Sequence, residues 1–360
     1  MTRERVELSE VAPRDGLQSI GPFVPTETKV AIVRASYEAG LRRMEVGSFV
    51  SPRAVPQMAD TGDVLKAAKQ LEGLECTVLV PNRRGFDAAM NAGADRFGLF
   101  MSVTESHNRA NLNRTREESF DELSAIVRGA PKGARFRFNL SCVFHCPFEG
   151  VVPETDALDW IERVTALDPF MEIALADTTG NAAPDQVRRV FETAHRSWGL
   201  RFAFHGHDTY GMGVANVAAA YGAGCRVFDA ASGGIGGCPF APGATGNVAM
   251  EDVAWLFARM GVETGANWNK LLAAADLAVL SQPVEQPGHG PGEGMMAALA
   301  ERGQQQHERG RVLAQPALAE RVVDHPAHDQ RAGRDRDRLP ARQLHLGGVD
   351  EEQLALRPVE

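Results

Sequence analysis

The sequence predicts an α/β protein in which residues 1–280 fold as one closed (β/α)8 TIM barrel and residues 281–360 form a poorly ordered tail. Short β-type runs alternate with amphipathic helical stretches, and this alternation implies parallel strands joined by crossover helices. Eight such units occur within the first 232 residues, which is the number that closes a barrel. The alternative is an open doubly wound sheet, which would need an early Gly-rich phosphate turn that the sequence lacks.

Hydrophobic runs mark the predicted strands, which span residues 6–13, 42–49, 75–81, 96–102, 135–144, 171–177, 201–207 and 226–232. Amphipathic stretches such as PDQVRRVFETAHRSWG separate most of them. Three of the helical stretches end in a glycine just before the next strand, at Gly40, Gly93 and Gly224. Glycine is the usual residue just past the C-terminus of a helix, so these positions predict where the helices end.

Composition excludes several classes of protein. A net charge of −9 argues against nucleic acid or an anionic membrane as the main partner. We expect no membrane span, because no apolar run approaches the length of about 20 residues that spanning requires. The charged start, MTRERVELSE, lacks a signal-peptide core. Five scattered cysteines fit a reducing cytoplasm better than a disulfide framework, so we expect a cytoplasmic protein.

Polar residues gather at the predicted strand ends. In a barrel the active site lies at the C-terminal ends of the strands. The polar residues at or just after those ends are Arg14, Asp15, Glu45, Ser48, Asp177, His205, His207 and Ser232. Packing alone does not explain so many polar groups at one rim, and the sequence therefore predicts an active site there.

The segment HGHDTYG, residues 205–211, predicts a metal site. His205 and His207 are two residues apart on a strand, so both side chains point to the same side, where Asp15 and Asp177 can converge on them. Asp208 points to the opposite face, and we interpret it either as a residue that supports the ligands from behind or as structural. Imidazole nitrogens together with carboxylate and amide oxygens suit Mg²⁺ or Mn²⁺ in octahedral geometry.

A glycine-rich segment, SGGIGGCPFAPGATGN, follows the last predicted strand and carries six glycines in sixteen positions. One interpretation is a flexible connector. A second interpretation is a functional loop, because glycines let the backbone approach a ligand closely. Cys238 lies in the middle of the segment, where a thiol can donate or accept a proton. Asn247 ends the segment and is a further candidate oxygen ligand for the metal.

Four segments together resemble the 3-hydroxy-3-methylglutaryl-CoA lyase family, a group of metal-dependent carbon–carbon lyases on a (β/α)8 barrel. They are VAPRDGLQ, EVGSFVSPRAVPQMAD, HGHDTYG and GGIGGCPFAPGATGN, and the resemblance covers about residues 5–280. The cysteine in the GGCP turn is its most specific feature, because related condensing synthases and aldolases lack it.

The resemblance implies a metal-dependent lyase that acts on an acyl-CoA thioester. It implies metal ligation by Asp15, His205, His207 and Asn247, stabilisation of an enolate by Arg14, and proton exchange by Cys238. Further family active-site positions match Glu45, Asp177 and Glu251, and we assign substrate binding to Arg14 and Ser48. For the base that deprotonates the substrate hydroxyl, Asp15 and a histidine such as His205 both remain candidates. We further expect a homo-oligomer, a dimer.

Two departures from the family pattern leave the acyl group open. Ala174 stands where serine is frequent, and His145 stands where glycine is usual. A related substrate, such as citramalyl-CoA, would be handled by the same mechanism. Two different functions also compete with the lyase: a condensing synthase, which Cys238 argues against, and a non-catalytic barrel disabled by an aberrant C-terminus.

The C-terminal composition is anomalous. After Lys270 the remaining ninety residues contain no Lys, Ile, Phe, Tyr, Trp, Thr, Asn or Cys. A segment of this kind buries little apolar surface, and we expect disorder over residues 281–360. An interaction tail is one explanation. Translation of GC-rich DNA out of frame is the explanation we favour, and sequencing the coding DNA near codon 281 tests it.

Overall fold

The computed structural model describes residues 4–168, 170–199, 201–237 and 246–281. Eight parallel strands close into a barrel in the order β1-β10-β9-β8-β5-β4-β3-β2, which confirms the predicted architecture. Their bounds are β1 (Glu7–Glu10), β2 (Arg43–Ser48), β3 (Glu75–Leu79), β4 (Arg96–Ser102), β5 (Arg135–Ser141), β8 (Glu172–Asp177), β9 (Phe202–Gly206) and β10 (Val227–Ala230). Cys238 and nearly all of the predicted tail lie outside the described residues.

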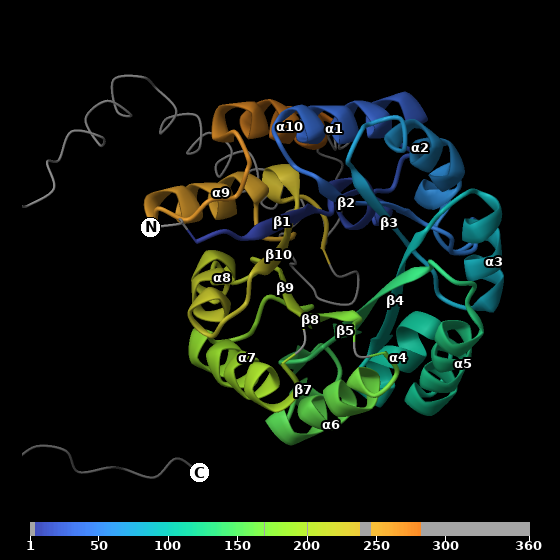
Figure 1. The fold of residues 1–360 in the computed structure, drawn as a ribbon, viewed down its shortest axis with the longest axis vertical. Helices are drawn as coiled ribbons and strands as arrows, with labels where there is room; N and C mark the ends of the chain where they lie inside the picture. The colour runs from blue at the N-terminus through green and yellow to red at the C-terminus, as the bar shows by residue number, and fades with distance from the viewer. Residues whose placement is uncertain (1–3, 169, 200, 238–245, 282–360) are drawn as a thin grey trace, which may run out of the picture.

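Helices surround the strands as an outer ring (Figure 1). They are α1 (Thr26–Glu38), α2 (Thr61–Ala68), α3 (Arg83–Asn91), α4 (Glu105–Leu112), α5 (Arg116–Gly129), α6 (Glu154–Thr165), α7 (Pro184–Trp198), α8 (Gly213–Gly222), α9 (Met250–Arg259) and α10 (Trp268–Leu280). The apolar core fills the space between this ring and the outer face of the barrel. No helix in the described part of the chain is long and apolar enough to cross a membrane.

Helix α7 illustrates why these segments are helical. Its buried residues, Val187, Val190, Phe191 and Ala194, follow the three-and-four spacing of one helical face. Pro184 occupies the first turn, where its missing N–H costs no hydrogen bond. The sequence pattern therefore determines both the start of the helix and the face that it buries.

The predicted helix-ending glycines have the expected backbone geometry. Gly40, Gly93 and Gly224 have φ values of 102°, 84° and 100°, in the left-handed region that only glycine adopts readily. At Gly40 a side chain is disfavoured by the backbone conformation and also by lack of space, because a Cβ atom would lie 2.3 Å from the carbonyl oxygen of Gly265.

The first strand is shorter than the sequence predicts. Strand β1 ends at Glu10, and Ala12–Gly16 instead form a π-helical turn, η1. The carbonyl of Val11 accepts the backbone N–H groups of Asp15 and Gly16 at 2.8 and 3.2 Å. Such turns are frequent at functional sites, and this one carries two of the predicted site residues.

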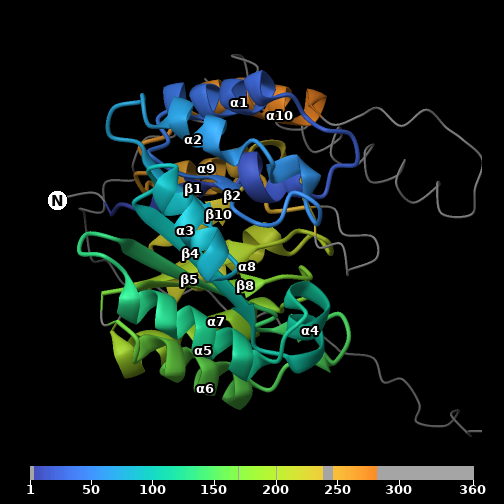
Figure 2. The same cartoon turned by 90° about the vertical axis from the view of Figure 1, so that its right-hand side faces the viewer.

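Two further short elements lie at the same end of the barrel. The predicted strand over 135–144 ends at Ser141, and a hairpin of β6 (His145–Cys146) and β7 (Gly150–Val151) follows it. Helix α4 follows β4 directly and lies at one end of the barrel in side view (Figure 2). That end is formed by the C-terminal ends of the strands, where the candidate site lies.

The barrel interior is unusually polar. Arg43, Arg137, Glu172 and Asp229 are all buried or nearly so and form ion pairs among themselves. Branched apolar side chains fill the interior of most barrels. Here Arg137 on β5 reaches across to Asp229 on β10, which is not a neighbouring strand. A charged network therefore occupies the space below the site.

Candidate active site

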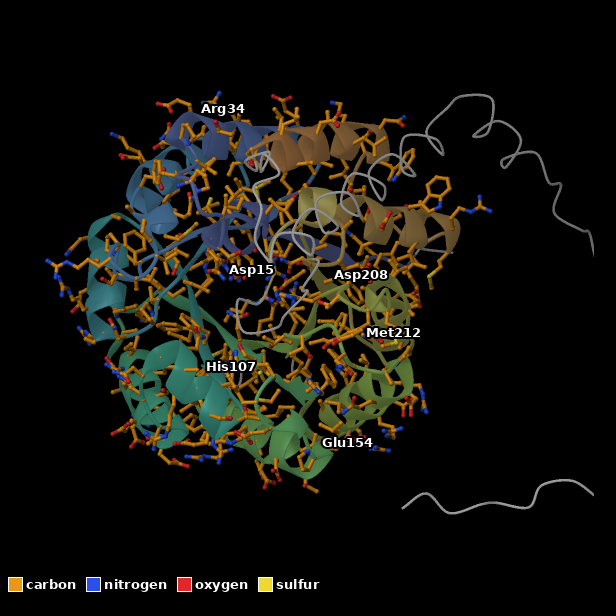
Figure 3. The ribbon with its side chains drawn as sticks, turned by 180° about the vertical axis from the view of Figure 1, so that it is seen from behind. Asp15, Arg34, His107, Glu154, Asp208 and Met212 are labelled. Atoms are coloured by element: carbon orange, nitrogen blue, oxygen red, sulfur yellow. The ribbon has the colours of Figure 1, made fainter. Side chains whose placement is uncertain are left out.

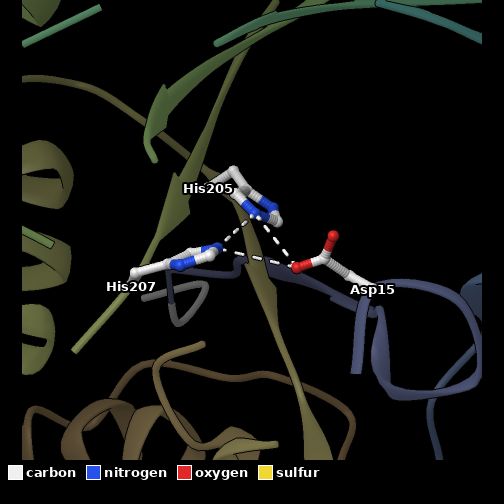
Figure 4. Close-up of side chains that lie close together, drawn as sticks. All are labelled: Asp15, His205 and His207. Carbon is white, nitrogen blue, oxygen red and sulfur yellow. Dashed lines mark hydrogen bonds and ion pairs between the residues drawn. The ribbon is translucent and has the colours of Figure 1, made fainter. Parts of the chain in front are cut away.

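Asp15, His205 and His207 form a cluster of potential metal ligands at the C-terminal end of the barrel (Figure 4). The two imidazole Nε2 atoms are 3.3 Å apart. Oδ2 of Asp15 lies 3.8 Å from the His205 Nε2 atom and 3.6 Å from that of His207. The sequence-based prediction that both histidines point together toward Asp15 is confirmed. Figure 3 shows Asp15 toward the middle of the helix ring, with Arg34 and Glu154 on its outside.

Asn247 joins this cluster from the far end of the glycine-rich segment. Its amide nitrogen donates to Oδ2 of Asp15 at 2.8 Å and to the carbonyl of Ile235 at 3.1 Å. A backbone bridge joins Asn247 to His207, the residue directly after β9. The structure thus places Asn247 beside the three residues with which the sequence grouped it.

The donor set fits a divalent cation. Oδ1 of Asn247 is buried and has no hydrogen-bond partner among the described residues, so a cation would satisfy it. Ligands in neighbouring positions of an octahedral ion lie about 3 Å apart, close to the separation of the two imidazole nitrogens. Two imidazoles, a carboxylate and an amide oxygen match the mixed set that suits Mg²⁺ or Mn²⁺.

Electrostatics favour the ligand form of Asp15 and His207. Burial alone would raise the pKa of Asp15, but the charge of Arg14 and the two histidines hold it well below its usual range. Burial lowers the pKa of His207, which favours the neutral imidazole that a metal requires. The pKa of His205 is raised despite burial, because its ring is hydrogen-bonded to Asp229 and lies near Asp15.

Arg14 presents a fixed positive charge beside the cluster. It is buried, and its Nε atom donates to Oε2 of Glu45 at 2.8 Å. Its terminal nitrogens contact Glu45 and Asp15. Burial alone would lower the pKa of Arg14, yet the two carboxylates raise it, so the guanidinium stays charged. Glu45 on β2 therefore holds Arg14 in place.

Asp177 does not join the cluster, and this part of the prediction was wrong. On β8 it pairs with Gly206, which lies between the two histidines and faces the other side of the sheet. Its carboxylate accepts the backbone N–H groups of Asn181 and Ala182 at 3.0 and 3.2 Å. Burial raises the pKa of Asp177 to about 7. Asp177 thus holds the loop after β8, and the active-site role that the family resemblance implies for it stays a prediction.

The structural interpretation of Asp208 is supported, and Ser48 lies near its expected place. Oδ1 of Asp208 accepts the backbone N–H of Gly213, the first residue of α8, at 2.6 Å. Ser48 is buried at the end of β2, with its hydroxyl 3.4 Å from the carbonyl oxygen of Leu79. The position of Ser48 is compatible with a substrate contact, which stays a prediction.

The two positions that depart from the family pattern differ in surroundings. Ala174 is fully buried in β8, where it packs against Ala203 and Val227. His145 is half-buried in the hairpin after β5, and its Nδ1 atom lies 3.2 Å from the hydroxyl of Thr179. His145 is therefore the departure that adds a polar group at the rim.

Glu10 is a functional-site residue that sequence reasoning missed. Its carboxylate accepts the backbone N–H groups of Ala12 and Ser232 at 2.9 and 3.0 Å. Ser36 and the hydroxyl of Ser232 donate to its other oxygen. Burial raises the pKa of Glu10. This carboxyl group links the turn that carries Arg14 to the start of the glycine-rich segment, a contact 222 residues apart in sequence.

Glu251 supports the same segment from α9. Its Oε2 atom accepts the backbone N–H of Gly233 at 3.1 Å, and burial raises its pKa to about 8. An acid with a raised native-state pKa stabilises the fold at low pH. That contribution is lost as the pH rises from the usual value of 4.5 toward 8.

We expect Glu251→Gln to remove this pH dependence, because glutamine keeps an acceptor for Gly233 but does not ionise. The free energy of unfolding of the variant, relative to wild type, should rise on the order of a few kcal/mol between pH 5 and pH 8.5. Denaturant unfolding at the two pH values measures this difference. A constant difference would show that Glu251 titrates normally in the folded protein.

Imidazole and carboxylate groups at the C-terminal ends of the strands of a barrel are typical of metal-dependent enzymes. The fold and the site of this chain have both features, which place it in that class. The family is more specific. The chain belongs to the HMGL-like family, whose model matches residues 5–278.

Proteins similar to this chain include hydroxymethylglutaryl-CoA lyases. The hydroxymethylglutaryl-CoA lyase of Pseudomonas mevalonii is 40% identical over 266 residues, which cover 73% of this chain and 88% of that protein. The structure of an HMG-CoA lyase from Brucella melitensis matches with a TM-score of 0.74 and 38% identity, covering 78% of this chain and 99% of that one.

An HMG-CoA lyase from Acenitobacter baumannii, solved in complex with coenzyme A and 3-methylmalate, matches with a TM-score of 0.75 and 35% identity. That match covers 80% of this chain and 95% of that one.

Proposed function

We propose that this chain cleaves 3-hydroxy-3-methylglutaryl-CoA to acetyl-CoA and acetoacetate, with Mg²⁺ or Mn²⁺ as the cofactor. The observation that carries the proposal is the placement of a permanently charged Arg14 directly beside the cluster of Asp15, His205 and His207. Cleavage of this thioester needs a polarised hydroxyl oxygen and a charge beside the thioester oxygen, and the site offers both within a few ångströms. The lyases with which the chain shares about 40% identity support the same substrate.

The metal ligands and the base act on the hydroxyl end of the substrate. A divalent ion held by Asp15, His205, His207 and Asn247 would polarise the hydroxyl and carboxylate oxygens of the substrate. Asp15 is the candidate to take the hydroxyl proton as the carbon–carbon bond breaks, and His205 could do so only through an Nε2 atom that does not hold the metal. The former hydroxyl carbon becomes the ketone of acetoacetate, and the bonding electron pair passes to the enolate of acetyl-CoA.

Arg14 and Cys238 act on that enolate. The guanidinium of Arg14, held by Glu45, lies where negative charge develops on the thioester oxygen. Cys238 then donates its thiol proton to the enolate carbon, which completes acetyl-CoA, and the thiolate regains a proton from solvent. Cys238 itself lies outside the described residues, between Gly237 and Asn247, and its assignment rests on the sequence.

The test is a substrate panel. Purified chain with Mg²⁺ should release acetoacetate from the hydroxymethylglutaryl thioester faster than it cleaves citramalyl-CoA, the related substrate that Ala174 and His145 leave open. Faster cleavage of citramalyl-CoA would mean that citramalyl-CoA is the substrate and that the chain is still a carbon–carbon lyase. If neither thioester is cleaved, the chain is a non-catalytic barrel.

We expect Cys238→Ser to lower turnover at least about a hundredfold, because a hydroxyl has a far higher pKa than a thiol and exchanges protons poorly near neutral pH. Metal affinity should stay near that of wild type, since the thiol is not a proposed ligand. Steady-state kinetics and Mn²⁺ titration measure the two effects. Cys76→Ser is the matched control, because Cys76 is buried on β3 and burial raises its pKa to about 12. Wild-type turnover in Cys238→Ser would remove Cys238 from the mechanism.

We also propose a cytoplasmic homodimer. Similar lyases are cytoplasmic in one case and mitochondrial in others, and scattered free cysteines fit a reducing compartment. The turn after α9 exposes Met260 and α10 exposes Leu277 and Leu280, apolar surface that a second copy would cover. Light scattering on the purified protein measures the mass of the assembly.

A further inference from the structure

We infer that Asp229 is a positioning residue that fixes the ring orientation and the tautomer of His205, and that Arg137 in turn fixes Asp229. The inference rests on the proposed metal site and adds two residues of the barrel interior that support it. Asp229 on β10 and His205 on β9 are register partners on neighbouring strands, so both side chains point into the barrel at the same level.

The hydrogen bonds determine which histidine nitrogen carries the proton. Oδ2 of Asp229 receives a terminal N–H of Arg137, a side chain that has only donors. The same oxygen lies 3.1 Å from Nδ1 of His205. An oxygen that already accepts from a guanidinium has only a lone pair left for the ring, so Nδ1 must be the donor. In the neutral ring Nε2 is then the nitrogen left for a metal, and it faces Asp15 and His207.

The support beneath Asp229 is itself rigid. Arg137 is buried, and its Nε atom donates to Asn139 at 3.0 Å while Nη1 lies 3.4 Å from Glu172. These contacts reach across the barrel from β5 and β8 to β10. The carboxylate of Asp229 is therefore held by Arg137 on the side away from Asp15 and His207.

The two histidines are held in different ways. Nδ1 of His207 is buried and has no hydrogen-bond partner among the described residues, while its backbone is bridged to Asn247. His207 therefore depends on the backbone of the glycine-rich segment, and His205 depends on Asp229. A change at Asp229 should affect one metal ligand and leave the other in place.

The test variant is Asp229→Asn, with Mn²⁺ titrated into the substrate-free protein. The asparagine oxygen would stay where it accepts from Arg137, but a neutral amide is a weaker acceptor than a carboxylate, so the hydrogen bond that keeps the proton on Nδ1 of His205 would be weakened. We expect Mn²⁺ affinity to fall about 10- to 100-fold. The matched control is Asp60→Asn, which alters a partly buried carboxylate that pairs with Lys29 and is not part of the Arg137 network, and which should leave affinity within about threefold of wild type.

Equal loss of affinity in both variants would overturn the inference, since it would reflect general damage to the fold. Wild-type affinity in Asp229→Asn would overturn it as well. Should Asp229→Asn fail to fold, nitrogen NMR of the metal-free wild type at alkaline pH reads the tautomer directly, with His205→Gln to assign the signal. The inference requires the proton on Nδ1, and a proton on Nε2 contradicts it.

The same experiment separates failure of the inference from failure of the proposed function. A wild-type chain that binds no Mn²⁺ would contradict the metal-dependent function. The NMR measurement of the His205 tautomer would still test the role of Asp229. A wild-type chain that binds Mn²⁺, together with an unaffected Asp229→Asn variant, would leave the function standing and remove only the positioning role.

Discussion

Replacing Arg14 by glutamine is expected to lower kcat by about a hundredfold to a thousandfold, while KM changes far less. The guanidinium lies buried between Asp15 and Glu45, and its charge matters most once the enolate forms. The lost interaction is therefore specific to the transition state. Steady-state kinetics with the hydroxymethylglutaryl thioester separate the two constants.

Arg14→Lys is the matched comparison. Lysine keeps the charge but lacks the planar fork that meets Glu45 through two nitrogens, so we expect a smaller loss of kcat than in Arg14→Gln. If instead KM rises and kcat stays unchanged in Arg14→Gln, Arg14 is a binding residue and the enolate must be stabilised by other groups.

Removal of divalent metal is expected to abolish turnover, with a loss of at least about a thousandfold, because polarisation by a bound cation contributes several kcal/mol to such a reaction. Dialysis against EDTA followed by addition of Mg²⁺ or Mn²⁺ should restore the rate. His207→Ala should weaken metal binding and turnover together, since its Nε2 atom is one corner of the cluster.

His195→Ala is the control for that variant. His195 lies on α7 and contacts the ring of Phe202, outside the metal cluster, so Mn²⁺ affinity should be unaffected by its loss. Full activity in metal-stripped wild type would eliminate the metal mechanism outright. Normal Mn²⁺ affinity in His207→Ala would show that the ion binds elsewhere.

The spacing of apolar residues and the residues that end helices were sufficient to predict the barrel and some of the site residues. Strands and helices differ in the spacing of their buried residues, so all eight strands could be located from the sequence. The pair His205 and His207 was predictable for the same reason, because residues two apart on a strand share a face. Arg14 and Asp15 were recognisable from their position just after the first strand.

Other features depended on contacts between distant parts of the chain. Asp177 is at the end of a strand like His207, but the register of β8 against β9 turns it away from the cluster. The link from Arg137 to Asp229 spans 92 residues, and the link from Glu10 to Ser232 spans 222. Sequence spacing determines which face of a strand a residue occupies. Only the closed barrel determines which residues from different strands meet, because its register and cross-barrel packing are set by all the strands together.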